Sequence, residues 1–155
     1  NPILIIVKKQ HNEFIDKKIT DLRCLFGNSV VTMEKSIKES LVRLRNNEIV
    51  ALLSDQSAPK ESVYVKFFGR SVATFQGPAA FALKSRAPVV MLFMIRQQNG
   101  TYKLFSEEIP CSDLEEYNQE NVEILTKRHV AELEKWIYQY PEQWLWMHKR
   151  WKNVK

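Results

Sequence analysis

The sequence predicts an α/β fold, with a mixed, mostly parallel sheet flanked by helices. Short apolar runs rich in β-branched residues, which suit strands covered on both faces, occur at residues 3–7, 29–32 and 49–53. Stretches with apolar residues at helical spacing separate these runs, and such alternation is typical of α/β domains. With 155 residues, of which 45% are hydrophobic, the chain is large enough for one core. Residues 1–155 are therefore expected to form a single domain.

The elements of the first third follow this alternation in order. After the first run, apolar residues at near-helical spacing predict a helix over residues 14–26, which ends at Gly27-Asn28. The second run follows directly as a strand. A further amphipathic helix is predicted around residues 37–44, before the third run.

The middle of the chain is predicted to be richer in loops. Between residues 55 and 76, polar loops flank one predicted strand at residues 63–68, and no helix is predicted. Loops at strand ends are where functional residues usually lie. Gly77-Pro78 then opens a helix, because proline is favoured at the first helical positions, and Pro88 ends it.

The C-terminal part contains the strongest hairpin signal. Residues 89–95 and 102–105 are strand-like and Asn99-Gly100 lies between them, so an antiparallel pair is predicted. A long amphipathic helix follows over residues 114–138 and stops at Pro141.

The charge balance favours an anionic partner. Lys and Arg total 23 against 18 Asp and Glu, which gives a net charge of +5. Nucleic acid and a phospholipid surface both fit this charge, but the sequence has neither an aromatic RNA-binding strand motif nor a helix-turn-helix pattern, so nucleic acid is not expected. Cys24 and Cys111 have no metal-ligand spacing, which predicts no metal site and a reducing compartment.

The start of the sequence suggests a piece of a longer protein. No apolar run approaches the roughly 18 to 20 residues that span a bilayer, and the first residues do not form a signal peptide. We expect this piece to be soluble or peripheral. Because it lacks an initiating Met and opens on an apolar run, we also expect it to be truncated at the N-terminus.

His11 and Asp16 are separated by four residues, the spacing of the catalytic dyad in glycerolipid acyltransferases. In such a dyad, the histidine takes the proton from an acceptor hydroxyl as it attacks an acyl thioester, and the carboxylate fixes the imidazole tautomer. In the alternative interpretation, Asp16 favours the dipole of the following helix and His11 is a solvated loop residue. The spacing alone leaves both open, since so short a motif has many chance matches.

Several ordered motifs carry a more specific signal. They are Asp55-Gln56, Phe67-Phe68-Gly69-Arg70, Gly77-Pro78-Ala79, Ala87-Pro88-Val89 and, from Pro141 to His148, Pro-Glu-Gln-Trp-Leu-Trp-Met-His. In order and spacing they resemble the bacterial lipid A biosynthesis acyltransferases, within the wider lysophospholipid and glycerolipid acyltransferase superfamily. The resemblance covers essentially the whole chain, and it implies a glycerolipid acyltransferase-like fold.

The resemblance places the catalytic histidine outside this chain. In the family, that histidine and its acidic partner belong to a His-Phe-Gly-Asn-Trp-Glu stretch upstream of the position of Asn1, and the chain contains no such stretch. The family's Arg, Asn and Asp at the first strand-to-helix junction fall at Lys8, Asn12 and Asp16, and His11 falls at a variable position. Lys8 departs from the pattern, since lysine and arginine are not equivalent as bidentate anion binders.

The resemblance also implies substrate-binding residues. Asp55 falls at the acid of the superfamily's Glu-Gly-Thr-Arg block, and with Gln56 it is placed to hydrogen-bond a polar headgroup. Lys66 and Arg70 bracket an aromatic pair, which suits contact with a lipid phosphate. In the alternative, Asp55 ends its strand or caps a turn, and the two cations are ordinary surface charge over a buried phenylalanine.

Aromatic and cationic residues are interleaved at the C-terminus, a pattern that suits an anionic membrane interface. They are Trp136, Trp144, Trp146, Trp151, His148, Lys149, Arg150 and Lys152. In the alternative, Trp144 and Trp146 pack in the core and only the final basic residues are wet.

The function implied by the resemblance is transfer of a fatty acyl chain from acyl carrier protein to a hydroxyl of a lipid A precursor or related glycolipid. The implied location is the cytoplasmic face of the bacterial inner membrane, with the parent protein anchored by an N-terminal segment absent here. Direct attack on a thioester implies no metal and no cofactor. The fragment alone would be inactive. The alternative function is a basic, non-catalytic module that binds anionic lipid or acyl carrier protein.

Overall fold

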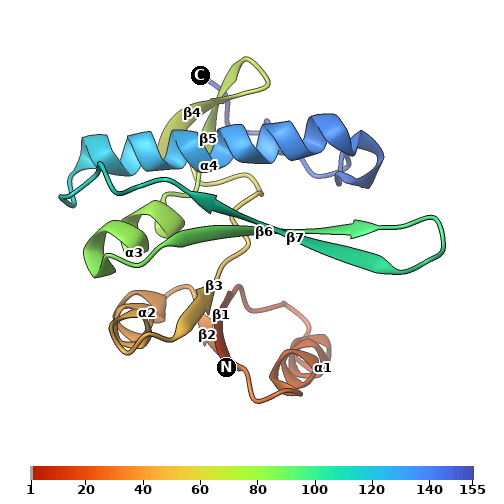
Figure 1. Ribbon diagram of the computed structural model, residues 1–155. Coiled ribbons are helices and arrows are strands. Elements are labelled where there is room, and N and C mark those ends of the chain that lie inside the picture. The colour runs from red at the N-terminus through yellow and green to blue at the C-terminus, as the bar shows by residue number, and fades with distance from the viewer. Residues whose placement is uncertain (1) are drawn as a thin grey trace. The chain divides into compact units, whose positions relative to one another are not determined.

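The structure, a computed structural model, describes residues 2–155 and confirms the predicted α/β class (Figure 1). The chain divides into two compact units. Unit 1 runs to Leu53, and unit 2 spans Ser54–Lys155. A sheet of three parallel strands lies in unit 1, and unit 2 contains two antiparallel hairpins.

Unit 1 has the predicted alternation of strands and helices. Its elements are β1 (Ile3–Val7), α1 (Glu13–Cys24), β2 (Ser29–Thr32), α2 (Ser36–Arg45) and β3 (Ile49–Ala51). The strand order is β2-β1-β3, so the chain reverses direction across the sheet after β2. Because crossovers between parallel strands are right-handed, this reversal places α1 and α2 on opposite faces of the sheet, as Figure 1 shows.

The ends of α1 follow from local chemistry. The Asn12 side chain accepts hydrogen bonds from the backbone N–H groups of Phe14 and Ile15 at 3.0 and 3.1 Å, which caps the first turn. Gly27 has a φ of +79°, the left-handed conformation that commonly ends a helix. The predicted helix is therefore confirmed.

Unit 2 opens with a hairpin that corrects the prediction of one strand at residues 63–68. Strand β4 (Val63–Phe67) pairs with a second strand, β5 (Arg70–Thr74). Phe68 and Gly69 form the two-residue turn between them, with φ values of +48° and +76°. Hairpin turns of this kind usually carry Asn-Gly or Gly-Gly, so the Phe-Gly pair hid the turn from sequence reasoning.

The next three elements confirm the prediction for the middle of the chain. They are α3 (Gly77–Ser85), β6 (Val89–Arg96) and β7 (Tyr102–Ile109). Strands β6 and β7 form the predicted antiparallel hairpin. In its turn the Asn99 side chain accepts the Thr101 backbone N–H at 3.1 Å, and Gly100 has a φ of +82°.

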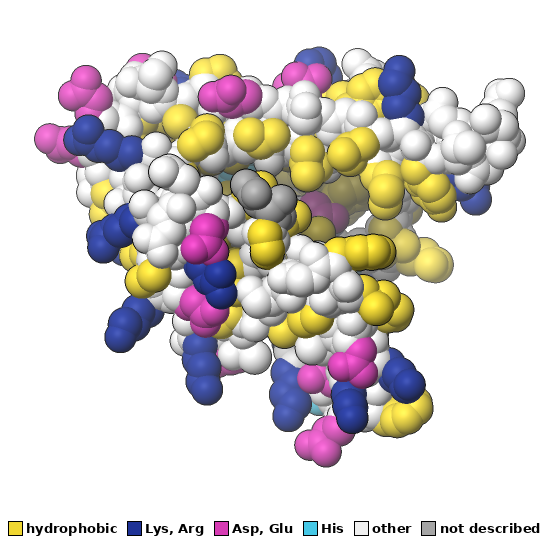
Figure 2. Space-filling model, turned by 60° about the horizontal axis from the view of Figure 1, so that its bottom comes forward, with side chains coloured by type: hydrophobic (Ala, Val, Ile, Leu, Met, Phe, Trp, Pro, Cys, Tyr) yellow, Lys and Arg dark blue, Asp and Glu magenta, His cyan; other side chains and the backbone are white. Residues whose placement is uncertain are grey.

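Hydrophobic side chains gather along the β6–β7 hairpin in Figure 2. Val90, Leu92 and Met94 alternate along β6 and are each more than half exposed, as is Leu104, the partner of Met94 on β7. The neighbouring positions of β6 are half-buried or buried. The hairpin therefore has one packed face and one bare apolar face.

The last helix, α4 (Gln119–Gln139), starts later than predicted and ends before Pro141, as predicted. Its first turn is capped by Asn118, whose side chain accepts the Asn121 N–H at 2.8 Å. Leu114 is buried in the core but lies in the preceding loop, so the apolar pattern extends beyond the start of the helix. A short 3-10 helix, η1 (Pro141–Gln143), follows.

The core of unit 2 forms where α4 packs against β4, β7 and α3. Phe67, Val72 and Leu125 are fully buried there. Burial of each such side chain stabilises the folded state by roughly 1.5–3 kcal/mol. Within residues 2–155, no helix is long and apolar enough to cross a membrane.

Candidate functional site

The last residues of the chain pair with β5 and widen the β4–β5 hairpin. The Ala73 backbone N–H donates to the Asn153 carbonyl at 3.0 Å, and Val72 forms an antiparallel bridge with Val154. The Asn153 side chain donates to the Ala58 carbonyl at 2.7 Å. These bonds fix the C-terminal segment, and with it the motif that precedes it, against the hairpin.

Arg150 anchors the same segment from inside. Its guanidinium donates to the Ala73 carbonyl at 2.8 Å and to the Thr74 hydroxyl at 2.7 Å, and it lies 5.0 Å from the centre of the Phe67 ring. The residue is only 1% exposed, so it is not one of the solvent-exposed basic residues that the sequence predicts at this end of the chain. Burial lowers the pKa of Arg150, and the negative charge of Asp55 acts in the opposite direction.

His129 is a second buried ionisable residue of unit 2. It lies on α4, one turn from Leu125 and one from Leu133, and is 4% exposed. Burial, reinforced by the positive charge of Arg150 and opposed by a nearby backbone carbonyl, lowers the pKa of His129 to about 4. The imidazole is therefore neutral at pH 7. Sequence reasoning did not single it out, although its spacing from two apolar residues marks it as part of the buried face.

Six aromatic rings meet where the hairpin, α4 and the C-terminal segment come together. This aromatic cluster consists of Phe67, Phe68, Trp144, Trp146, Trp151 and Tyr138. The Phe68 ring lies 4.8 Å from that of Phe67 and 5.0 Å from that of Tyr138, measured between centroids. Trp146 and Trp151 are stacked within 6° of parallel, 6.3 Å apart. Such geometries add attraction beyond the buried area alone.

Phe68 occupies its place in the cluster at a conformational cost. A φ of +48° is uncommon for a bulky residue, and single residues in this region carry strain on the order of 1–2 kcal/mol. The Phe68 backbone N–H donates to the carboxylate of Glu134 on α4. This charge-assisted hydrogen bond and the ring contacts together hold the turn in place.

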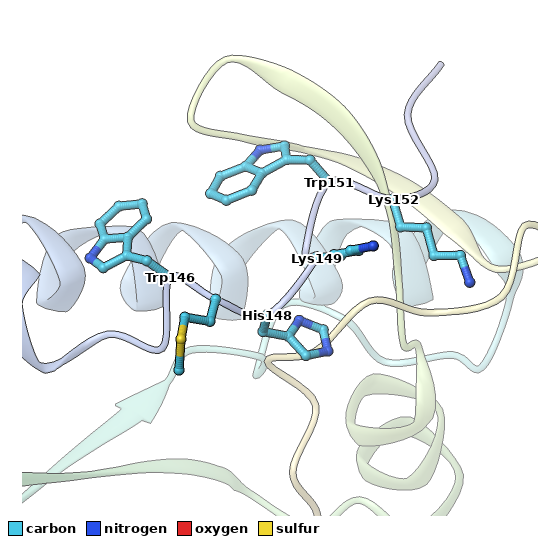
Figure 3. Close-up of a pocket in the computed structure, with 6 residues that line it drawn as sticks. Trp146, His148, Lys149, Trp151 and Lys152 are labelled. Carbon is cyan, nitrogen blue, oxygen red and sulfur yellow. The ribbon is translucent and has the colours of Figure 1, made fainter.

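Two open hollows adjoin the aromatic cluster. One, of about 390 Å³, is lined by Phe68, Arg70, Trp146 and Trp151. The other, of about 370 Å³, is lined by Trp146, Met147, His148, Lys149, Trp151 and Lys152. In Figure 3 the two indoles lie at one end of this second hollow, and the amino groups of Lys149 and Lys152 point away from them. The site thus joins aromatic faces to cationic groups.

The tryptophans divide between the two environments considered for them. Trp136 is buried and stacks on Phe93 at 4.6 Å, and Trp144 packs against the core. Trp146, in contrast, is 53% exposed, and Trp151 is half-buried. The interpretation that these side chains pack in the core is therefore confirmed for Trp144 and wrong for Trp146.

Of the substrate-binding residues suggested by the sequence, Arg70 lies at the aromatic cluster and the others do not. Arg70 lines one hollow, whereas Lys66 is exposed between buried neighbours of β4 and so points to the other face of the hairpin. Asp55 is half-buried, close enough to Arg150 to affect its pKa, and Gln56 beside it is exposed.

Three further candidates lie in unit 1. Lys8 and His11 are exposed, and the Asp16 carboxylate accepts the Gln10 backbone N–H at 2.8 Å. In the described part of the chain, no hydrogen bond or ion pair joins His11 to Asp16. Residues 2–155 also contain no group of three or more His, Cys, Asp or Glu side chains that could hold a metal ion.

Comparison with known proteins agrees with the motifs that build this site. A model of the bacterial lipid A biosynthesis acyltransferase family matches residues 2–153. A lipid A biosynthesis acyltransferase of Haemophilus influenzae is 26% identical over 148 residues, which are 94% of this chain and 45% of that protein. The chain thus spans less than half the length of this relative. It belongs to the bacterial lipid A biosynthesis acyltransferase family.

Proposed function

We propose that this chain is the acceptor-side part of an acyltransferase that moves a fatty acyl chain from acyl carrier protein to a hydroxyl of a lipid A precursor or related glycolipid. The observation that carries the proposal is the family match across residues 2–153, which includes all the motifs around the aromatic cluster. The Haemophilus influenzae relative is named a lipid A biosynthesis acyltransferase, which agrees with the proposed class of reaction.

The proposed chemistry is direct transfer. The acceptor hydroxyl oxygen attacks the thioester carbonyl, a C–O bond forms, the C–S bond breaks, and the thiol of the carrier leaves with a proton. A histidine base takes the hydroxyl proton and returns it to the leaving sulfur. We place that histidine in the part of the full-length protein outside this chain, so the chain alone would be inactive. The proposal requires no metal and no cofactor.

The proposed acceptor contacts come from polar residues of unit 2. A guanidinium can bind a phosphate through two parallel hydrogen bonds, and Arg70 lies beside aromatic faces that suit the apolar part of a lipid. Asp55 and Gln56 would hydrogen-bond the sugar, and Lys66 would contribute positive charge. The proposed location is the cytoplasmic face of the inner membrane, with an anchor outside this chain.

A second candidate function is a non-catalytic module that binds anionic lipid or acyl carrier protein. The chain has 23 basic and 18 acidic residues, and this positive net charge favours a module that binds an anionic partner. It differs from the first in predicting no loss of acyl transfer when the residues around the aromatic cluster are changed. Nucleic acid is not part of either proposal.

The test is acyl transfer from radiolabelled acyl carrier protein to a lipid A precursor. The full-length protein, its His11→Ala and Arg70→Gln variants, and residues 1–155 alone are compared. We expect the His11→Ala variant to transfer the acyl chain and the Arg70→Gln variant to have a raised KM for the acceptor. Residues 1–155 alone should show no acyl transfer. Turnover by residues 1–155 that His11→Ala abolishes would instead make His11 and Asp16 the dyad and overturn the proposed division of the site.

A further inference from the structure

We propose that the exposed end of unit 2 beside the aromatic cluster is a docking surface for an anionic phospholipid bilayer. This docking surface consists of Tyr138, Leu145, Trp146 and Met147 together with Arg70, Lys149 and Lys152. The inference rests on the proposed membrane location, and it concerns the bilayer itself rather than the reacting acceptor.

The apolar side chains of the docking surface are strongly exposed to solvent. Met147 is 88% exposed, Tyr138 73%, Leu145 57% and Trp146 53%. Three of these residues are consecutive, so a single short segment presents large apolar side chains to solvent. Apolar patches of this kind on a folded protein indicate a partner that covers them. Trp and Tyr in particular favour the headgroup level of a membrane, where an apolar ring and a polar N–H or O–H are both satisfied.

The cations of the docking surface are free to meet an anionic partner. Within residues 2–155, no carboxylate lies within salt-bridge distance of Arg70, Lys149 or Lys152, whereas Lys127 and Lys135 on α4 each pair with a glutamate. The acidic residues near this end of α4 and on η1 are Glu132, Glu134 and Glu142, and Glu132 is paired with Lys135. Glu134 is engaged by the Phe68 backbone N–H, and Glu142 is exposed on η1.

The docking surface is also pre-shaped. The Trp146 indole N–H donates to the Pro141 carbonyl at 2.6 Å, which fixes the ring orientation. The Trp151 indole N–H reaches the Phe67 carbonyl at 3.4 Å, and Arg150 holds the backbone between them from inside. Because the Trp146 ring and the backbone that carries it are already held in place, little conformational entropy is lost from this ring when a partner covers it.

A bilayer fits this composition better than an acidic protein such as acyl carrier protein. Lysine is depleted in protein–protein interfaces, whereas lysines next to tryptophan and bulky apolar residues are typical of interfacial membrane segments. Each lysine near an anionic bilayer strengthens binding by about fivefold. Two lysines beside four apolar side chains therefore suit reversible binding at the membrane surface.

The test is binding of the 155-residue chain to vesicles made from equal parts of phosphatidylcholine and phosphatidylglycerol, with pure phosphatidylcholine vesicles as reference. We expect sedimentation with the anionic vesicles and quenching of tryptophan fluorescence by brominated lipid. The double variant Lys149→Gln/Lys152→Gln should bind on the order of tenfold or more weakly. Met147→Ala should also weaken binding and reduce quenching.

Matched controls make the same chemical changes elsewhere on unit 2. Lys60→Gln/Lys127→Gln removes two positive charges, and Met94→Ala truncates a methionine that is 66% exposed on the β6–β7 hairpin. Both should bind as the unchanged chain does. Equal losses in variants and controls, or no preference for anionic vesicles, would overturn the docking surface. Loss of acyl carrier protein binding alone, with vesicle binding unchanged, would overturn it in favour of a protein partner.

The outcome is independent of catalysis. If the full-length protein fails to transfer an acyl chain while the vesicle result holds, the proposed function fails and the docking surface stands. If transfer is observed but the vesicle variants match their controls, the docking surface fails alone.

Discussion

At the scale of single residues, Arg150 shows how a charge is used inside this protein. Two of its nitrogens donate to the Ala73 carbonyl and to the Thr74 hydroxyl, which itself donates to the Val72 carbonyl at 3.3 Å. Its remaining Nε has no hydrogen-bond partner in the described part of the chain. Within residues 2–155 no carboxylate lies within salt-bridge distance of Arg150, so the residue ties the C-terminal segment to β5 through neutral acceptors.

Replacing Arg150 tests this role. Arg150→Ala should lower the free energy of unfolding by about 2–4 kcal/mol, because it leaves the buried Ala73 carbonyl without this donor, removes the bond to the Thr74 hydroxyl and removes packing on Phe67. Urea unfolding followed by circular dichroism measures the change. Lys149→Ala, at the exposed neighbouring position, is the control and should change stability by less than about 0.5 kcal/mol. Equal effects at the two positions would contradict the anchoring role.

His129 predicts a dependence of stability on pH. Because its pKa is lowered to about 4 in the folded state from an ordinary value of 6.5, only the unfolded chain takes up this proton as the pH falls between these values. The free energy of unfolding should therefore decrease from pH 7 to pH 4, by up to about 3 kcal/mol from this group. Urea titrations at several pH values measure the slope.

The control for His129 is a matched pair of variants. His129→Leu should remove most of the decrease, since leucine does not titrate and the position lies between two leucines of α4. His148→Leu should leave the decrease in place. If the unfolding free energy of His129→Leu still decreases from pH 7 to pH 4, the decrease arises from other groups.

Phe68 predicts an inverted order of stability for two truncations. Both Phe68→Ala and Phe68→Gly remove the ring and its contacts, but only glycine adopts a φ of +48° without strain. Phe68→Gly should therefore be more stable than Phe68→Ala by about 1 kcal/mol, whereas glycine is usually the more destabilising. Thermal and urea unfolding compare them. The opposite order would mean that the turn relaxes when the ring is removed.

At the scale of elements, the sequence predicted those whose local signals agree with their packing. The parallel strands of unit 1 and the β6–β7 hairpin have the expected composition and turn residues, and they form as predicted. Strand β5 was not predicted because its turn residue, Phe68, is chosen for contacts with α4 and the C-terminal segment. Those contacts join residues far apart in the sequence, and no local pattern reports them.

The start of α4 was misplaced for a related reason. Leu114 continues the apolar pattern of the helix because it belongs to the same core, although its backbone is in a loop. An ion pair holds this loop to α4, with Arg128 donating to both carboxylate oxygens of Asp113 at 2.6 and 2.7 Å. Hydrophobic periodicity reports burial, and it does not by itself distinguish a helix from a loop that packs beside it.

At the scale of the whole molecule, the candidate site was predictable in its motifs and not in its geometry. The motif ending at His148 and the Phe-Phe-Gly-Arg motif are recognisable in the sequence, and the structure brings them together in the aromatic cluster. The separation of Lys66 from Arg70 depends on strand alternation across a turn that was not predicted. The burial of Arg150 depends on pairing between residues more than 70 positions apart.

The C-terminal segment that pairs with β5 also has a consequence for synthesis of the protein. The hairpin leaves the ribosome long before Arg150, yet Phe67 gains its contact with Arg150, and Val72 its bridge to Val154, only when these last residues arrive. During translation of α3, β6, β7 and α4, the nascent chain must therefore hold an unfinished core, in which an aromatic face and a strand edge are open. A chaperone that recognises apolar strands would find its target in this interval.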